Sequence, residues 1–228
     1  MRTIAILPIK SFGAAKQRLV GLLGTGAREA LVQAMFQDVL LALRRVPELD
    51  AIAVVSANVV AHRAARGEGV ILLDDEHEAG HSEAASIGIR HAVHAGFDRA
   101  LLVAGDTPLL DPGEVSALLN DAARDRTDLV VVPDRHGTGT NALLVRPPTA
   151  IEPSFGLGSC ARHRELAAAA EIACRVAEVP SLGLDVDTPE DLAELTDLLA
   201  ASRVKATMTR GALRQLDRSR ASSPAPTT

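Results

Sequence analysis

Tryptophan and tyrosine are absent from this chain of 228 residues, and phenylalanine occurs only four times, so its core must be aliphatic. No apolar stretch approaches the ~18 residues of a membrane-spanning helix. The N-terminal run Ile4–Leu7 is too short for a signal peptide, so we expect a cytoplasmic protein with no membrane partner. The two cysteines, Cys160 and Cys174, lack metal-site spacing, which favours reduced thiols over a disulfide.

Positive charge is scarce over most of the chain. The formal net charge is -5, and residues 203–228 carry six Lys or Arg against one acid, which leaves about -10 on residues 1–202. Such an acidic body argues against a nucleic-acid partner. Apolar periodicity ceases after Ala201. We therefore expect one domain over residues 1–201 and a basic, flexible C-terminal tail over residues 202–228, in which a frayed helix before Leu216 is left open.

Short apolar runs alternate with helical patterns along the chain. Strands are expected at Thr3–Leu7, Ala51–Val55, Val70–Leu73, Ala100–Ala104 and Leu129–Pro133, and helices at Arg28–Val46, Val59–Arg66, Gly80–Gly96 and Pro112–Arg124. A further apolar run covers Ala142–Val145. The alternation predicts an α/β fold with a mostly parallel central sheet flanked by helices. Ligands of such sheets bind beyond the carboxyl ends of the strands.

Charged residues follow two of the expected strands at that edge. The stretch LLVAGDTP places Asp106 directly after a buried strand. The stretch PIKSFGAAKQRL, broken by Gly13, places Lys10, Lys16 and Arg18 after the first strand. A cationic loop that leads into a helix suits the phosphates of a nucleotide, and solvated surface charges are the alternative.

Two more carboxylates stand close together near the end of the expected domain. Asp185 and Asp187 flank Val186, so in an extended segment both side chains face the same side. Such a pair favours a cation between the carboxylates. Alternatively, Asp187 helps to cap the helix for which Thr188 is the expected N-cap.

Glycine-rich stretches separate the last elements. Backbone N–H groups and hydroxyls over residues 138–141 suit an anion cradle or a plain β-turn. Gly156 and Gly158 predict an irregular loop, and Ser159 stands where the next helix begins, either as a cap or as a ligand of phosphate or carboxylate. Ser82 is expected to cap the helix within Gly80–Gly96.

Five motifs between Thr3 and Leu199 occur in a characteristic order: LPIKSFGAAKQRL, VAGDTPLL, GTGTNALL, SFGLGSCARH and DVDTPEDL. Together they resemble the guanylyltransferases of coenzyme F-420 biosynthesis, which join GTP to phosphoenolpyruvate, 2-phospho-L-lactate or 3-phosphoglycerate. The chain departs from that family's pattern in the helix start GHSEAAS.

The resemblance implies a single-domain nucleotidyltransferase fold of the Rossmann-like, nucleotide-diphospho-sugar transferase type. It implies that magnesium binds Asp106, Asp185 and Asp187, that the acceptor binds Thr140, Gly156 and Ser159, and that Lys10, Lys16 and Arg18 form a catalytic loop on the triphosphate.

We therefore expect transfer of GMP from GTP to phosphoenolpyruvate or 2-phospho-L-lactate, with release of pyrophosphate. The acceptor phosphate is largely dianionic at pH 7, so no general base is expected. The alternatives are a 3-phosphoglycerate guanylyltransferase, a molybdopterin or sugar nucleotidyltransferase on the same fold, and a non-catalytic nucleotide-binding protein. A homodimer is left open.

Overall fold

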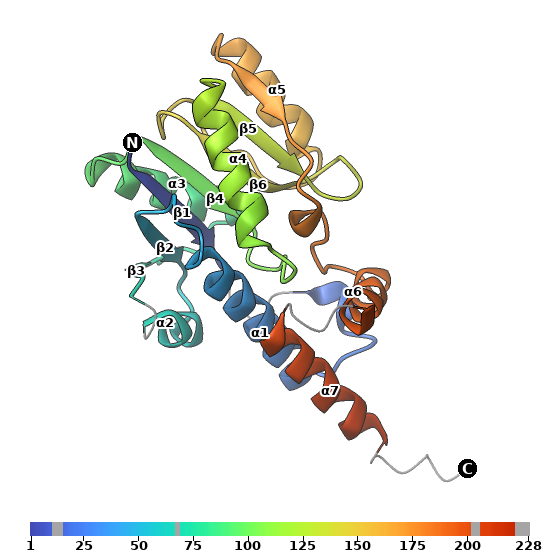
Figure 1. The fold of residues 1–228 in the computed structure, drawn as a ribbon. Helices are drawn as coiled ribbons and strands as arrows, with labels where there is room; N and C mark the ends of the chain where they lie inside the picture. Colours follow the sequence, from blue (N-terminus) through green and yellow to red (C-terminus); the bar gives the residue numbers. More distant parts are fainter. Residues whose placement is uncertain (11–15, 67–68, 202–205, 222–228) are drawn as a thin grey trace.

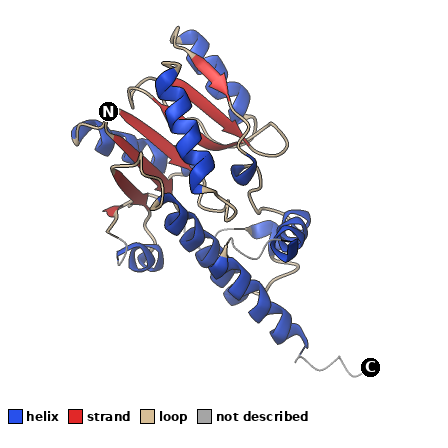
Figure 2. Ribbon diagram, in the orientation of Figure 1, coloured by secondary structure: helices blue, strands red, loops and turns tan. Residues whose placement is uncertain are grey.

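The computed structural model of the chain describes residues 1–10, 16–66, 69–201 and 206–221. A single seven-stranded sheet with the order β3-β2-β1-β4-β6-β5-β7 forms its centre (Figure 1, Figure 2). The strands are β1 (Thr3–Pro8), β2 (Ala51–Val55), β3 (Ile71–Leu73), β4 (Arg99–Val103), β5 (Leu129–Pro133), β6 (Thr140–Val145) and β7 (Cys174–Val176). Neighbouring strands are parallel except for β6, which is antiparallel to both β4 and β5. The expected α/β fold with a mostly parallel sheet is confirmed.

Helices cover both faces of this sheet. Every residue of β1 is buried, because its aliphatic side chains point alternately to the two faces. Ala5 and Leu7 join one apolar cluster, with α1, α2, α4, α6 and α7, whereas Ile4 and Ile6 join the other, with α3 and α5. The helices are α1 (Thr25–Leu43), α2 (Val59–Arg66), α3 (His81–His94), α4 (Pro112–Arg124), α5 (Ser159–Ala169), α6 (Pro189–Ala201) and α7 (Thr207–Ala221), with short 3-10 turns η2 (Gln17–Leu19) and η3 (Pro180–Leu182).

The C-terminal region differs from the expected flexible tail, because residues 207–221 form α7, which runs alongside α1 (Figure 1). The first backbone N–H groups of a helix need acceptors, and here a distant residue supplies them. Buried Asp38 of α1 accepts from the backbone N–H groups of Met208 (3.1 Å) and Thr209 (2.7 Å). Such a long-range cap leaves no sign in the local sequence pattern.

Helix α3 also starts differently from the expectation. Its N-cap is Gly80, whose φ of 122° lies in a region that glycine adopts readily, and the expected cap, Ser82, lies inside the helix. The Ser82 hydroxyl instead accepts a hydrogen bond from the backbone N–H of Phe155 (2.9 Å). This contact ties the start of α3 to the loop before α5.

Cys160 and Cys174 are both free, as expected. Among the described residues, no helix is long and apolar enough to cross a membrane. Gly13, the expected break in the cationic loop, lies outside the described residues, as do residues 222–228 of the expected tail.

Candidate active site

A cavity of about 580 Å³ lies beyond the carboxyl ends of β1 and β4, a volume typical of small-molecule sites. It is lined by every site residue that the sequence predicts. These are Lys10, Lys16, Arg18, Asp106, Thr140, Gly156, Ser159, Asp185 and Asp187. The residues come from the β1 loop, the end of β4, β6, the start of α5 and the segment before α6. The topology thus brings together groups that lie far apart in the sequence.

The turn after β4 places Asp106 in this cavity. Gly105 allows the chain to pass close to Ile9, since a Cβ atom on Gly105 would lie 2.3 Å from Ile9 Cδ1. The backbone carbonyl of Asp106 accepts from the N–H of Val186 at 3.3 Å. The end of β4 is therefore joined directly to the segment that carries the other two aspartates.

Lys16 connects the basic loop with two of these carboxylates. Its ammonium group donates to Asp106 Oδ2 and to Asp187 Oδ1, the latter at 2.6 Å. Burial opposes the charge of Lys16, but the charges of Asp106 and Asp187 outweigh it and raise the pKa of Lys16 above its usual value. Burial likewise opposes ionisation of Asp106, yet Lys16 lowers the pKa of this carboxyl.

Asp185 has no comparable cationic partner among these contacts. Burial, followed by the charge of Asp106, raises the pKa of Asp185 to about 6, although the Asn141 amide donates to its Oδ1 atom at 3.2 Å. The Lys16 ammonium thus pairs with two of the three carboxylates. Among the residues that the structure describes, the carboxylate of Asp185 is left without an ion-pair partner.

The predicted magnesium site requires Asp106, Asp185 and Asp187 to be arranged around one position. Within the described ranges, no group of three or more His, Cys, Asp or Glu side chains is arranged to hold a metal ion. The Lys16 ammonium group contacts both Asp106 and Asp187 instead. The magnesium site stays a prediction.

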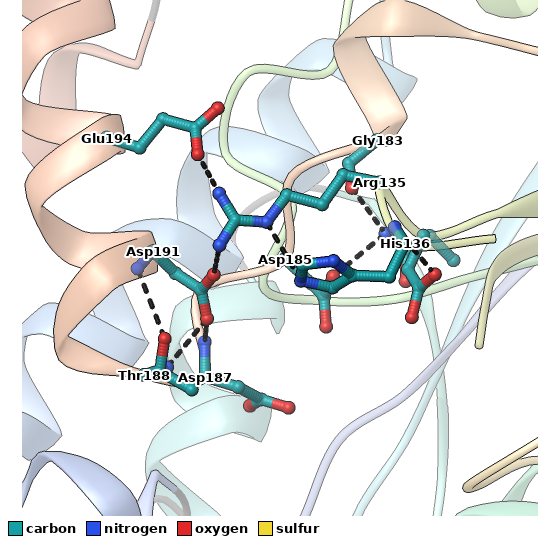
Figure 3. A network of polar contacts seen from close by, with 10 residues as sticks. Arg135, His136, Gly183, Asp185, Asp187, Thr188, Asp191 and Glu194 are labelled. Atoms are coloured by element: carbon teal, nitrogen blue, oxygen red, sulfur yellow. Dashed lines mark hydrogen bonds and ion pairs between the residues drawn. The ribbon is translucent and has the colours of Figure 1, made fainter. Parts of the chain in front are cut away.

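A polar network holds the segment that carries Asp187 (Figure 3). Thr188 caps α6, as expected, by accepting from the Asp191 N–H at 3.2 Å, and Asp191 accepts in turn from the N–H groups of Asp187 (2.9 Å) and Thr188 (2.7 Å). Arg135 pairs with Asp191 and Glu194 and thereby joins the β5–β6 loop to α6. The backbone of Asp187 is thus fixed, while its carboxylate points away from the cap and pairs with Lys16.

The glycine-rich stretch before β6 is neither an open anion cradle nor a plain turn. Its backbone N–H groups bind a carboxylate of the chain itself, because Asp134 accepts from His136 (3.1 Å), Thr138 (2.9 Å) and Gly139 (2.9 Å). The cradle expected for a ligand is therefore filled by Asp134. Thr140 belongs to strand β6 instead.

The three predicted acceptor-binding residues form another part of the cavity lining, here called the acceptor wall. Thr140 begins β6 and Ser159 begins α5, and the Ser159 hydroxyl donates to that of Thr140 at 3.0 Å. The N-cap of α5 is Gly158, so Ser159 is not the cap. Gly156 has a φ of 108°, which glycine adopts readily and other residues rarely do.

Two histidines that the sequence did not assign to the site lie near it, His81 and His163. His81 lines the cavity, and burial lowers its pKa to about 4. His163 is fully buried, and burial, then Arg162, lowers its pKa to about 4 as well. Phe155 makes edge contacts with both rings. The spacing of four between Ser159 and His163, which places both on one face of α5, is the signal that could have found His163.

Comparison with known proteins gives a consistent result. The family model described as "Guanylyl transferase CofC like" matches residues 3–219. A phosphoenolpyruvate guanylyltransferase from Conexibacter woesei is 50% identical over 216 residues, which cover 95% of this chain and 97% of that protein. A 2-phospho-L-lactate guanylyltransferase from Methanothermobacter thermautotrophicus is 35% identical over 195 residues, which cover 86% and 84%.

A solved structure shares the fold. It is a putative nucleotide-diphospho-sugar transferase from Desulfovibrio desulfuricans, with a TM-score of 0.75 and 20% identity, and the match covers 96% of each chain. The nucleotide-diphospho-sugar transferase-like fold expected for the chain is therefore confirmed.

Proposed function

The chain belongs to the family of CofC-like guanylyl transferases, and on this premise we propose that it transfers GMP from GTP to phosphoenolpyruvate. The observation that carries the choice of acceptor is the 50% identity to a phosphoenolpyruvate guanylyltransferase over 95% of the chain, against 35% to a 2-phospho-L-lactate enzyme. The product would be a diphospho-guanosine compound of coenzyme F-420 biosynthesis, and pyrophosphate would leave.

The acceptor phosphate is already a nucleophile and needs no activation. The main obstacle to the reaction is therefore the electrostatic repulsion between two negatively charged phosphates. The second pKa of the acceptor phosphate lies near ~6, so this phosphate attacks the α-phosphorus of GTP in line without a general base. Lys10, Lys16 and Arg18 would bind the β- and γ-phosphates as they leave. Lys16 would exchange its present carboxylate partners for those phosphate oxygens.

We also propose that Asp106, Asp185 and Asp187 hold one or two Mg²⁺ ions. Their carboxylate oxygens are the ligands that a hard divalent cation prefers. The raised pKa of Asp185, caused by burial and by the charge of Asp106, supports the need for additional positive charge. When bound, the ion would supply positive charge that offsets the repulsion between the two phosphates.

The acceptor would bind on the wall formed by Thr140, Gly156 and Ser159. Hydroxyl groups there can donate to its phosphate or carboxylate, and the N-terminal end of α5 favours an anion. Neutral His81, which also lines the cavity, adds no charge to repel or hold the substrates at pH 7.

Pyrophosphate release tests the proposal. The protein with Mg²⁺ is incubated with each of the four nucleoside triphosphates and with phosphoenolpyruvate, 2-phospho-L-lactate or 3-phosphoglycerate. We expect release with GTP and phosphoenolpyruvate. Preference for another acceptor or nucleotide would replace that part of the proposal. Calorimetric binding of GTP without pyrophosphate release from any pair would favour a non-catalytic nucleotide-binding protein.

A further inference from the structure

His163 lies behind the predicted acceptor wall and makes hydrogen bonds through both ring nitrogens. Its Nε2 atom accepts from the backbone N–H of Ser154 at 3.0 Å, and its Nδ1 atom lies 3.1 Å from Thr140 Oγ1. A backbone N–H can only donate, so Nε2 must carry a lone pair. The neutral imidazole then has its single proton on Nδ1 and donates it to Thr140.

The loop that carries the Ser154 N–H is held in place by the side chain of Arg162. Arg162 donates to the backbone carbonyls of Ser154 and Phe155, both at 3.2 Å, and to that of Leu157. These bonds hold the loop against the first turns of α5, so the Ser154 N–H stays directed at His163. Burial of the His163 ring lowers its pKa to about 4, which keeps the imidazole neutral at pH 7.

The tautomer decides how many hydroxyl protons face the cavity. Within the part of the chain that the structure describes, Thr140 Oγ1 and Ser159 Oγ bond to each other, and only Thr140 contacts His163. The bond between the two hydroxyls uses one of their two protons, in whichever direction it runs. Since His163 donates, the second proton remains available to a ligand. If His163 accepted instead, both protons would be used within the protein.

We propose that His163 is a positioning residue that reserves one hydroxyl proton of the Thr140–Ser159 pair for an anionic oxygen of the acceptor. This inference rests on the proposed function for the identity of the acceptor. The proton count itself follows from the contacts of His163 alone. The wall would accordingly select an ionised phosphate or carboxylate oxygen over a group that must itself donate.

The tautomer can be measured without any enzymatic activity. Long-range ¹H–¹⁵N correlation spectra of ¹⁵N-histidine-labelled protein at pH 7 distinguish a protonated Nδ1 from a protonated Nε2. The His163→Gln variant assigns the signal by its loss. We expect His163 to be neutral with the proton on Nδ1. A proton on Nε2, or on both nitrogens, would overturn the inference even if the protein is an active guanylyltransferase.

Two variants then connect the tautomer with binding. His163→Asn can place an amide donor near the Nδ1 position, whereas the longer side chain of His163→Gln places its amide near Nε2. We expect about a tenfold rise in the KM for phosphoenolpyruvate in His163→Gln, little change in the KM for GTP, and substantial rescue in His163→Asn. His94→Gln, at the exposed end of α3, is the matched control.

Thermal unfolding and circular dichroism establish that the variants are folded before their kinetics are compared. Equal changes in both KM values, or equal behaviour of the Asn and Gln variants, would overturn the positioning role. If the wild-type protein releases no pyrophosphate, the proposed function is refuted. The measured tautomer of His163 still tests the count of hydroxyl protons in that case.

Discussion

The two walls of the cavity are built in different ways. The acidic wall consists of Asp106, Asp185, Asp187 and Lys16, and full charges hold it together. The hydroxyl wall consists of Thr140, Ser159 and His163, which are all buried and joined by neutral hydrogen bonds. The Lys16 ammonium is a compact charge on a flexible stem, whereas a buried and satisfied hydrogen-bond network is rigid.

We infer from this difference that the two walls have different roles in the reaction. The acidic wall has three carboxylates and one ammonium, and it is the wall proposed to hold the metal ion. The hydroxyl wall is the wall proposed to donate a hydrogen bond to an anionic oxygen of the acceptor. We therefore expect substitutions in the acidic wall to affect turnover, and substitutions in the hydroxyl wall to affect affinity for the acceptor.

The largest effect is expected from Asp106→Asn. The substitution keeps the size of the side chain but removes a charge that now pairs with Lys16. We expect turnover to fall by ~100-fold or more, the scale of losing one electrostatic stabiliser of the transition state. Pyrophosphate release at saturating substrates and Mg²⁺ measures it.

Asp74→Asn is the matched control, because the Asp74 side chain is 79% exposed and does not line the cavity. Its turnover should equal that of the wild type. Near-normal turnover in Asp106→Asn would mean that Asp106 is not a metal ligand. It would also contradict the expectation that substitutions in the acidic wall affect turnover.

Much of the fold could be predicted from apolar patterning. The bounds of Ala51–Val55, Val59–Arg66 and Pro112–Arg124 match their elements, because aliphatic runs and a proline at a helix start are local signals. The antiparallel direction of β6 could not be predicted, since an apolar run does not reveal its neighbours. Helix α7 could be expected only as a frayed helix before Leu216, because its cap, Asp38, lies in α1.

That the candidate site residues lie together was predictable to a similar degree. Strand order explains why Asp106 and Lys16, which are 90 positions apart, meet at one edge of the sheet. The contacts that decide the behaviour of these residues come from side chains with no motif of their own. Asp134 fills the expected anion cradle, and Arg135 fixes the segment before α6.

The pH dependence of stability tests whether the hydroxyl wall is neutral. Burial, then Arg162, lowers the pKa of His163 from 6.5 to about 4, so between these values the unfolded chain binds a proton that the folded protein excludes. The stabilising contribution is complete above pH 6.5 and is lost as the pH falls towards 4. At pH 5 the loss is about 2 kcal/mol.

Urea denaturation of the wild type and His163→Gln between pH 7 and pH 5 measures this contribution. The free energy of unfolding should fall by about 2 kcal/mol less in the variant than in the wild type. His81, whose pKa is also lowered to about 4, remains in both proteins and cancels in the difference. Parallel curves would mean that His163 titrates normally and that the wall is not held neutral.

The smallest effect is expected from Ser159→Ala. Thr140 still accepts from His163 in this variant and keeps its own proton for the acceptor, so only one hydroxyl is lost. We expect the KM for phosphoenolpyruvate to rise several-fold, less than in His163→Gln, with the KM for GTP unchanged. Ser116→Ala is the control, because Ser116 bonds to Glu48 outside the cavity. Equal rises in both KM values would place Ser159 away from the acceptor. A rise larger than that of His163→Gln would mean that Ser159, and not Thr140, donates the proton that the acceptor needs.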